Sequence, residues 1–493
     1  MLCSAQPMLS RIPALDCPFP TRAASLVAGV VTLLLCGPAA RAQGIGEDPT
    51  GIPGQQNLTL GSGARAFGMG GAFLARADDA TAASWNPAGL SYLRAPELSF
   101  VGVYNSFTTT QNLDNDSLKG SSVDFAAFTW PIGAGEIRGA VQLSYQRAIS
   151  FDGDRHVNQY DVIPPATTPT LVRIDEGDSN GGFDVVALGT GLRLSRHVRA
   201  GFTVNRWLNG YRQSLERNIY NIPTNRPRRH FDQSFKPSGW SFNVGLIVSP
   251  VESLNLAAVY KTPFTAGVDV SRSRRDYYDS AQAPTEVTIN SFSSEFVRLD
   301  FPSSFGLGVS WRPRDTLTLS ADYTRSNWQA GRIRDYFAIA ATPASDDDGV
   351  PAPPPPPVFF DELQYPTLEP VPDPGNPTDP ALLVAQQDAE QIRAGVEWVL
   401  IKGQVRIPLR VGYFNDRQIA PAPGGGGAIR FNGLTAGTGL ILGAMQLDFA
   451  WVYEFGEYFV ASEATNRVPI RNALTTNRVY ASIIYRFSGR WMP

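Results

Sequence analysis

The sequence predicts an all-β fold: a membrane-spanning, antiparallel, up-and-down β-barrel of about 14 strands, with a small, partly helical N-terminal plug, or hatch, inside its lumen. Three observations lead to this prediction. Polarity alternates residue by residue over strand-length segments, and the connections between the segments are alternately long and short. No segment after the N-terminus approaches the ~20 continuous apolar residues of a membrane helix. Since lipid permits only helices and closed barrels to span it, the chain is either a soluble exported protein or a barrel.

Residues 1–42 are predicted to be a secretory signal peptide. Arg11 and Arg22 give it a positive start, residues 23–35 form an apolar run too short to span a bilayer, and residues 40–42 form a small-x-small cleavage motif. An N-terminal anchor helix is the alternative. All three cysteines lie in this segment, so its removal leaves no disulfide framework, thiolate zinc site or cysteine nucleophile.

Charge and histidine placement exclude further classes of protein. The formal net charge is -3, which gives no support for nucleic-acid binding, because that needs a basic patch or stripe. His156, His197 and His230 do not have metal-ligand spacing, and no cofactor is expected. Ser179 follows Gly-Asp as in some lipases, but it lacks the strand–turn–helix context of a catalytic serine. We therefore do not expect an enzyme.

Residues 43–95 are predicted to form the hatch. They are rich in Gly and Ala and do not alternate in polarity. Asp78 or Asp79 can cap a helix over residues 80–85, and Asn86 can cap a second helical turn whose first position is Pro87, where the missing donor is no loss. A barrel of about 14 strands is wider than side chains alone can fill, so a compact plug suits its lumen.

Residues 96–487 are predicted to form the barrel, followed by a C-terminal tail at 488–493. Over residues 137–146 the odd positions are apolar and the even positions are mostly polar, and residues 317–324 and 445–454 show the same period of two. Such segments begin near Leu98, Val123, Ile137, Phe183, Val198, Trp240, Leu254, Phe301, Leu317, Ile392, Val405, Phe431, Met445 and Val479.

The connections between strands assign the two ends of the barrel. Short turns are expected at the periplasmic end and long loops outside, which also puts both termini on the periplasmic side. The largest loop is 326–390, and the expected loops also include 109–121 and 263–300. The tryptophans fit two interfacial girdles: Trp130 and Trp311 flank short turns, and Trp240 and Trp328 flank long loops.

Two features, one in the largest loop and one in the last strand, bear on partners. In the largest loop, residues 346–348 are aspartates that either bridge lipopolysaccharide through divalent ions or are simply solvated, and residues 353–357 are prolines that keep the segment extended. The last strand ends on Tyr485 and Phe487, which resembles the signal read by barrel-assembly machinery. Outer-membrane lipid, lipopolysaccharide and that machinery are therefore the expected macromolecular partners.

Residues 63–73 (GARAFGMGGAF) and 77–90 (ADDATAASWNPAGL) carry a family resemblance. They resemble the hatch of the FadL/TodX family of outer-membrane long-chain fatty acid and hydrocarbon transporters, including its Asn-Pro-Ala motif at Asn86, Pro87 and Ala88, followed by Gly89. Residues 260–264, 301–308, 317–328 and 393–413 are similar to the family too.

The resemblance implies a mechanism of passive uptake. A hydrophobic ligand is captured outside by the long loops and passes to an internal site, the hatch shifts, and the ligand leaves sideways through a gap made by a kink in the third strand. Here that strand is about 136–150, and Gly133, Gly135 and Gly139 are the candidates for the lateral opening.

A carboxylate head group would need a cationic partner inside the lumen. Strand parity makes Arg138, Arg206 and Lys261 the candidates, and the alternative for each is an ordinary lumen charge paired with Asp or Glu. An alternative function is also open: a barrel that transports nothing and acts in surface attachment or in a secretion complex. The hatch motif does not separate the two functions.

Overall fold

The structure is a computed structural model, and it describes residues 61–111, 114–134, 137–150, 152–161, 170–219, 225–280, 291–328, 333–334, 368–371, 382–385, 388–421, 428–461 and 469–487. The expected signal peptide, the first part of the hatch, the aspartate and proline runs and the C-terminal tail lie outside these residues. Within the described residues, no helix is long and apolar enough to cross a membrane.

Fourteen strands form a closed antiparallel barrel, as the sequence predicts. Each strand is registered with the next, and the last returns to pair with the first along Glu97–Gln111, so the sheet has no free edge there. The barrel strands are β1 (Glu97–Gln111), β2 (Asp114–Ala134), β3 (Ile137–Ser150), β5 (Thr170–Arg193), β6 (Val198–Ile219), β7 (Asn225–Val251), β8 (Leu254–Lys261), β11 (Ser304–Arg314), β12 (Leu317–Ser326), β16 (Ala389–Lys402), β17 (Val405–Pro421), β18 (Ala428–Leu442), β19 (Met445–Ala461) and β20 (Pro469–Arg486).

Several expected loops are partly strand. The connection expected at 109–121 shrinks to residues 112–113, because β1 and β2 continue their pairing outward. The loop expected at 263–300 contains β9 and β10, and β9 extends the sheet by pairing with the outer half of β7. Backbone pairing continues there although polar residues on both faces hide the alternation in the sequence. The additional strands are β4 (Gly153–Asp161), β9 (Phe264–Ser280), β10 (Ser291–Phe301), β13 (Ile333–Arg334), β14 (Leu368–Val371) and β15 (Leu382–Ala385).

The two faces of the barrel wall are reversed relative to a soluble protein. In β3, Gln142 is 1% exposed and Ser144 6% exposed, whereas Leu143 between them is 58% exposed. Apolar side chains therefore cover the outside and polar ones line the inside, as a lipid-facing barrel requires.

The tryptophans only partly follow the predicted girdles. Trp130, Trp240 and Trp311 are exposed on the outer face. Trp328 is 5% exposed and packs against Phe301, so it belongs to the lumen and the girdle prediction is corrected at this position. Trp328 lies two residues past the end of β12 and continues the inward face of Thr324 and Ser326, so its position beside a long loop did not place it in a girdle.

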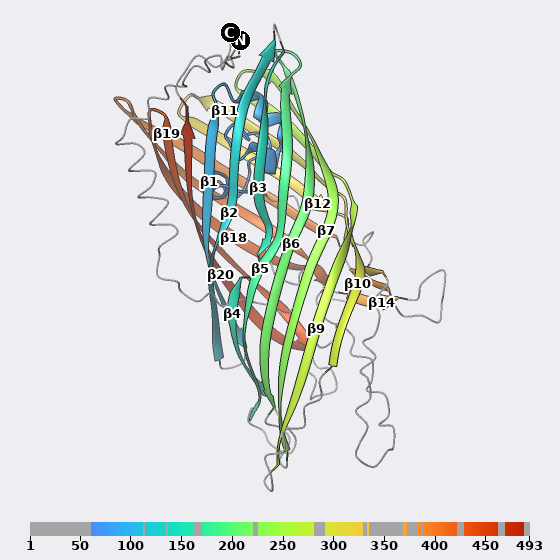
Figure 1. Cartoon of the computed structure of the whole chain (residues 1–493). Helices are drawn as coiled ribbons and strands as arrows, with labels where there is room; N and C mark the ends of the chain where they lie inside the picture. Colours follow the sequence, from blue (N-terminus) through green and yellow to red (C-terminus); the bar gives the residue numbers. More distant parts are fainter. Residues whose placement is uncertain are drawn as a thin grey trace, which may run out of the picture. The chain divides into compact units, whose positions relative to one another are not determined.

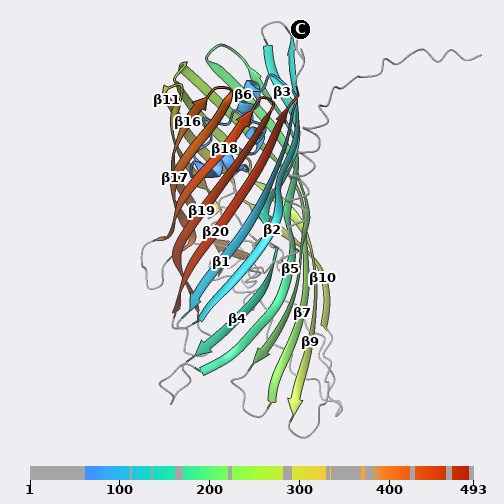
Figure 2. The same cartoon turned by 90° about the vertical axis from the view of Figure 1, so that its left-hand side faces the viewer.

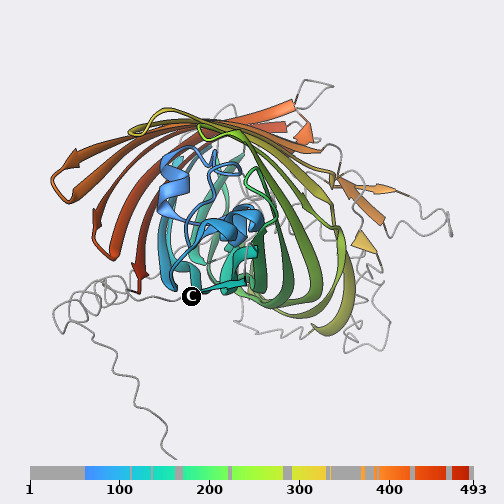
Figure 3. The same ribbon diagram turned by 90° about the horizontal axis from the view of Figure 1, so that it is seen from above.

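The hatch lies inside the ring of strands, as the blue helices in Figure 3 show. In Figure 1 it lies near the end where the strands are joined by short turns at 195–197, 252–253, 315–316, 403–404 and 443–444, here called the short-turn end. Its described helices are α2 (Ala64–Gly68), α3 (Ala82–Trp85) and the 3-10 helix η1 (Pro87–Tyr92).

Candidate functional site

Asn86 joins the hatch helices to the barrel wall. Its Oδ1 accepts a hydrogen bond from the backbone N of Ala88 at 3.1 Å and so caps η1, with Pro87 at the first position, as the sequence predicts. Its Nδ2 donates to the carbonyl oxygens of Leu74 in the hatch (3.0 Å) and Leu246 in β7 (3.3 Å). This fully buried side chain therefore forms hydrogen bonds with backbone groups of both the hatch and the barrel wall.

The residues around Asn86 are held by close backbone approach. A Cβ at Gly89 would overlap the carbonyl oxygen of Ala77, so no larger residue fits without a shift. Asp79 accepts from the backbone N of Thr81 at 2.9 Å, and α3 begins one residue later. The helix predicted at 80–85 is thus slightly shorter, and Asp79 supports its start.

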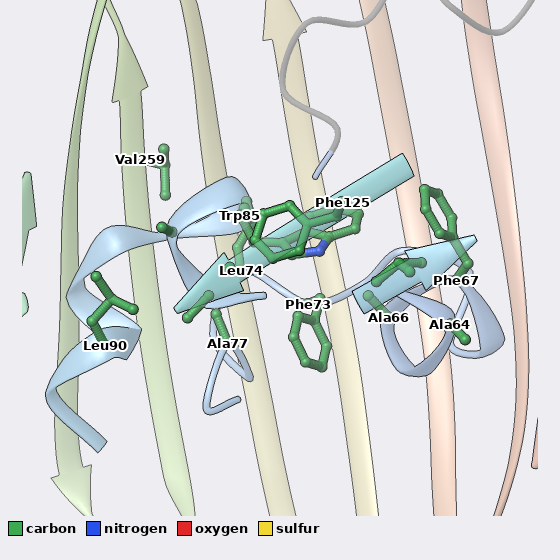
Figure 4. Close-up of a cluster of buried hydrophobic side chains, with 14 of the residues drawn as sticks. Ala64, Ala66, Phe67, Phe73, Leu74, Ala77, Trp85, Leu90, Phe125 and Val259 are labelled. Atoms are coloured by element: carbon green, nitrogen blue, oxygen red, sulfur yellow. The ribbon is translucent and has the colours of Figure 1, made fainter. Parts of the chain in front are cut away.

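The hatch has a small aromatic core around Trp85 (Figure 4). The Trp85 ring meets the edges of Phe67 (centroids 5.8 Å apart) and Phe73 (6.0 Å), and its Nε1 donates to the carbonyl oxygen of Ser62 at 2.7 Å. Phe67 also stacks on Tyr480 of β20 at 4.2 Å. This core continues into the wall, so the hatch docks by apolar burial as well as by polar contacts.

Buried charges clamp one side of the hatch to the wall. Glu397 of β16 is 3% exposed and lies 2.8 Å from Nε of Arg410 in β17, 3.3 Å from Nε of Arg65 and 3.4 Å from Nη2 of Arg76. The last two arginines belong to the hatch, where Asp78 Oδ1 lies 2.7 Å from Arg65 Nη1. Glu397 is therefore the ion through which wall and hatch meet, and we name this group the Glu397 cluster.

The two hatch arginines remain cationic at neutral pH. Burial, and then the charge of Arg65, lower the pKa of Arg76 to about 10, although Glu397 opposes this. Burial also disfavours the charged form of Arg65, but attraction by Glu397 and Asp79 raises its pKa above the usual value. Both hatch arginines therefore meet Glu397 as cations.

Wall side chains also bind the hatch backbone. Asp322 of β12 accepts from the backbone N atoms of Phe73 (2.6 Å) and Leu74 (2.8 Å), and Arg393 of β16 donates to the carbonyl oxygen of Gly70 at 2.6 Å. Sequence reasoning missed these residues and the Glu397 cluster. A charge at an inward position of an alternating strand was the available signal, but that signal does not name a partner.

A cavity lies between the hatch and the barrel wall. Ala83 and Ser84 of α3 form its hatch side. Lys261 of β8 and Trp207 of β6 are among the wall residues that line it. The remaining wall lining is partly polar and partly apolar: Ser144, Gln146, Ala148, Val185, Ala187, Asn205, Ser241, Asn243, Thr262, Phe264, Pro302 and Ser304.

Stacked aromatic rings lie along one side of this cavity, and two of them, Trp207 and Phe264, line it directly. Phe264 and Phe301 are nearly parallel at 4.7 Å, and Trp207 stacks on Phe264 at 4.9 Å and on Phe301 at 5.3 Å. Phe183 and Trp328 add edge or tilted contacts to Phe301. Such a surface offers apolar area and ring faces to a hydrophobic molecule. We name these five residues the aromatic wall.

The structure separates the three predicted head-group residues. Lys261 lines the cavity beside the aromatic wall. Arg138 is exposed at the short-turn end of β3, away from the cavity, opposite Arg193 of β5. Arg206 lies on the outer face, with its guanidinium 5.3 Å from the ring of the exposed Trp240.

This arrangement corrects the parity assignment of Arg206. Its neighbour Trp207 is 7% exposed and points inward, so the usual order of apolar outside and polar inside is reversed at this point of β6. Aromatic residues occur on both faces of this strand, which is why alternation alone gave the wrong phase.

The third strand is interrupted near the cavity. β3 is registered with β2 from Ile137 to Gln146. It stays with β5 to Ser150 with a bulge after Arg147, and β4 resumes the pairing with β5 at Gly153. Among the described residues, the register between β2 and β3 thus ends at Gln146, and Figure 2 shows β4 beside β5. Gln146 and Ala148, at this point, also line the cavity.

The glycines expected to permit the opening lie elsewhere. Gly133 is paired with Arg138 and Gly139 with Ile132, inside an unbroken stretch of pairing near the short-turn end. A Cβ at Gly139 would overlap the carbonyl oxygen of Gly191, so this glycine allows a close approach of β5 and not a gap. Gly135 lies outside the described residues.

Comparisons with known proteins give structural matches. No protein-family model matches the sequence, and no curated protein matches it. The chain is similar to the toluene transporter TbuX of Ralstonia pickettii, at 13% identity and a TM-score of 0.53, over 87% of this chain and 99% of that chain. It is similar to a FadL homologue of Pseudomonas aeruginosa, at 12% identity and a TM-score of 0.56, over 87% and 99%. It is also similar to the toluene transporter TodX of P. putida, at 13% identity and a TM-score of 0.52, over 87% and 100%.

These matches extend along nearly the full length of the other chains, while the identities are too low to carry more than the fold. The resemblance of residues 63–73 and 77–90 and the barrel geometry lead to the same fold independently. The chain therefore has the fold of the FadL and TodX transporters.

Proposed function

We propose that the protein is a bacterial outer-membrane channel, not an enzyme, that takes up hydrophobic molecules passively. The observation that carries the proposal is the cavity bounded by the hatch on one side and by the aromatic wall on another. Burying apolar ligand surface there yields roughly 0.8 kcal/mol per methylene, and ring contacts add about 0.5–1.5 kcal/mol per pair. The similar structures described as toluene transporters support a ligand of this class.

The proposed path begins at the long-loop end and leaves sideways. Gln146 and Ala148 connect the cavity to the place where β3 parts from β2. A ligand leaving between these strands enters lipid directly and never crosses water, which suits a molecule of low solubility. The short-turn end, where β1 begins and β20 ends, would then face the periplasm.

Lys261 gives the cavity a site for a carboxylate head group. It lines the cavity with the neutral side chains of Asn205 and Asn243. A fatty acid would place its head group near Lys261 and its tail along the aromatic wall, whereas an aromatic hydrocarbon would use the aromatic wall alone. Both ligand classes are therefore included in the proposal.

The test is uptake of labelled oleate and labelled toluene by cells that lack their own transporter and make this protein. The variant Ala83→Cys/Gly189→Cys fixes α3 to β5, because a Cβ added at Gly189 would lie 3.5 Å from the Cβ of Ala83. That separation falls in the ~3.5–4.5 Å range of disulfides. All native cysteines lie in residues 1–42, so their removal leaves a single bridge.

We expect uptake with the wild-type protein, background uptake with the oxidised double variant, and recovery after reduction. The two single-cysteine variants are the controls and should transport normally. Normal uptake by the fully oxidised variant would remove hatch movement from the proposal. Absence of uptake of both compounds by a surface-folded wild-type barrel would contradict the channel function. Pull-down through the external loops would then test the surface-attachment or secretion-complex alternative.

A further inference from the structure

A second cavity opens at the short-turn end, between the hatch and the strand turns. Asp78 and Glu252 are the carboxylates that line it. Against them stand arginines of the hatch and of two separate wall hairpins, β5–β6 and β11–β12, together with His197. The arginines are Arg76, Arg94, Arg193, Arg196, Arg199 and Arg312. We name this cavity the mouth pocket.

Three of these six arginines have only neutral partners among the described residues. Arg76 is ion-paired with Asp78 and Glu397. Of the rest, Arg193 donates to the carbonyl oxygen of Ser195 (3.3 Å), Arg199 to Oγ of Ser249 (3.1 Å) and Arg312 to the carbonyl oxygen of Glu252 (3.4 Å). Within the part of the chain that the structure describes, none of these three is ion-paired with a carboxylate. The positive charge of the mouth pocket is therefore largely uncompensated.

Two guanidinium donors of arginines that line the mouth pocket are buried and unused. The Nε atoms of Arg76 and Arg199 are inaccessible to solvent and have no hydrogen-bond partner among the described residues. A buried donor without a partner is costly, and a charged one especially so. One of these donors comes from the hatch and the other from the wall.

Neighbouring like charges add to this cost. Arg193 stands directly opposite Arg138 in the β3–β5 register, a placement that is unfavourable for two cations. The charge of Arg312 is also one of the influences that lower the pKa of Arg76. An anion in the mouth pocket would relieve both repulsions.

The orientation of Arg199 is fixed from one face. Its guanidinium lies 4.2 Å from the ring centre of Tyr92 in the hatch. Stacking occupies the face of the guanidinium and leaves its N–H edge for an acceptor in the plane. Planar, multiple N–H donation of this kind matches carboxylate and phosphate oxygens.

We propose that the mouth pocket binds an oxyanion, a carboxylate or a phosphate group, that bridges the hatch to the barrel wall. The oxyanion accepts from Arg76 on the hatch and from Arg199 on the wall, with Arg312 and Arg196 at the rim. Because both sides contribute, the anion binds the docked hatch and stabilises it. This proposal does not rest on uptake of hydrophobic molecules, because the mouth pocket shares no lining residue with the cavity beside the aromatic wall.

The test measures binding to the purified full barrel in zwitterionic lipid nanodiscs by calorimetry. Inorganic phosphate is the probe for a free anion. Octanoate is the probe for a carboxylate on an apolar tail, with octanol as its uncharged match. The pocket variant is Arg196→Gln/Arg312→Gln, and the control variant is Arg314→Gln/Arg406→Gln, which removes the same charge from exposed positions outside the mouth pocket.

We expect saturable phosphate binding that weakens with added salt and is about tenfold weaker in the pocket variant and unchanged in the control variant. Hydrogen exchange of hatch amides should slow when phosphate is added to the wild type, and much less in the pocket variant. If only octanoate shows this dependence, with octanol insensitive, the oxyanion is the head group of a lipid-like molecule. The proposal is overturned if neither probe binds saturably, or if both double variants weaken binding equally.

Discussion

The two sides of the hatch are attached to the barrel in different ways. The side near α2 meets β16 and β17 through the Glu397 cluster, whose wall ions Glu397 and Arg410 are almost completely buried. The side near α3 and η1 packs small residues against glycines of the wall, with Ala83 beside Gly189 and Pro87 beside Gly201. Separating buried ions costs far more than sliding small side chains past glycine. If the hatch moves, we expect the α3 side to move while the α2 side stays in place.

The largest expected effect is at Glu397. The substitution Glu397→Gln leaves the cations of Arg65, Arg76 and Arg410 without their shared counterion and should destabilise hatch docking by about 3–5 kcal/mol. Hydrogen exchange of the hatch amides measures this. Glu390→Gln is the control on the same strand, because its partners are more exposed and the loss should be about 0–1 kcal/mol. Equal protection of the hatch amides from exchange in both variants would contradict the idea that the Glu397 cluster anchors the α2 side of the hatch.

The Asn86 contacts should matter less than the Glu397 cluster. Asn86→Ala removes the cap of η1 and both bonds to carbonyl oxygens, so we expect a loss of about 2 kcal/mol in docking of the α3 side. Ser91→Ala, which loses one local bond to Ala88, is the control. Faster hydrogen exchange in Asn86→Ala that is confined to η1 and α3 would support separate attachment of the two sides of the hatch. Faster exchange over the whole hatch would contradict separate attachment.

The aromatic wall can be tested with a pair of tryptophans. Trp207→Ala removes a ring that is 7% exposed and lines the cavity, so affinity for toluene should fall by roughly 1–2 kcal/mol, about tenfold. Trp240→Ala removes a ring that is 55% exposed on the outer face and should leave affinity unchanged. Binding measured by quenching of tryptophan fluorescence in detergent distinguishes them. Equal losses would place the ligand elsewhere.

The smallest expected effect separates the two ligand classes. Lys261→Met keeps the apolar stem and removes the charge next to the cavity. Affinity for oleate should fall by about 1 kcal/mol, and affinity for toluene should stay the same. Competition binding with labelled oleate and labelled toluene measures both affinities. A change in toluene binding alone would show that Lys261 acts through packing and not through its charge.

Local signals in the sequence were reliable. Asn86 followed by Pro87 marks a capped helix start from the neighbouring residues alone, and the structure has that cap. Alternation over residues 137–146 fixed a strand because the two faces meet different solvents. Alternation does not say which face is outside where both carry aromatic rings, and this is how Arg206 was misplaced.

Contacts between residues far apart in the sequence could not be predicted from local sequence patterns. The Glu397 cluster joins Arg65 to a residue 332 positions away, and nothing in either segment names the other. Gly139 looked like a place for a kink because glycine permits both a bend and a close approach, and only the position of β5 decides between them.

The sequence by itself determined that this chain is a closed barrel of about 14 strands with a capped helical plug, because a period of two and helix caps depend on adjacent residues. The tertiary structure alone decided that the β2–β3 register ends at Gln146 and that the mouth pocket gathers arginines from separate hairpins. These features depend on which strands become neighbours when the barrel closes. That closure is a property of the whole chain and of no single segment of it.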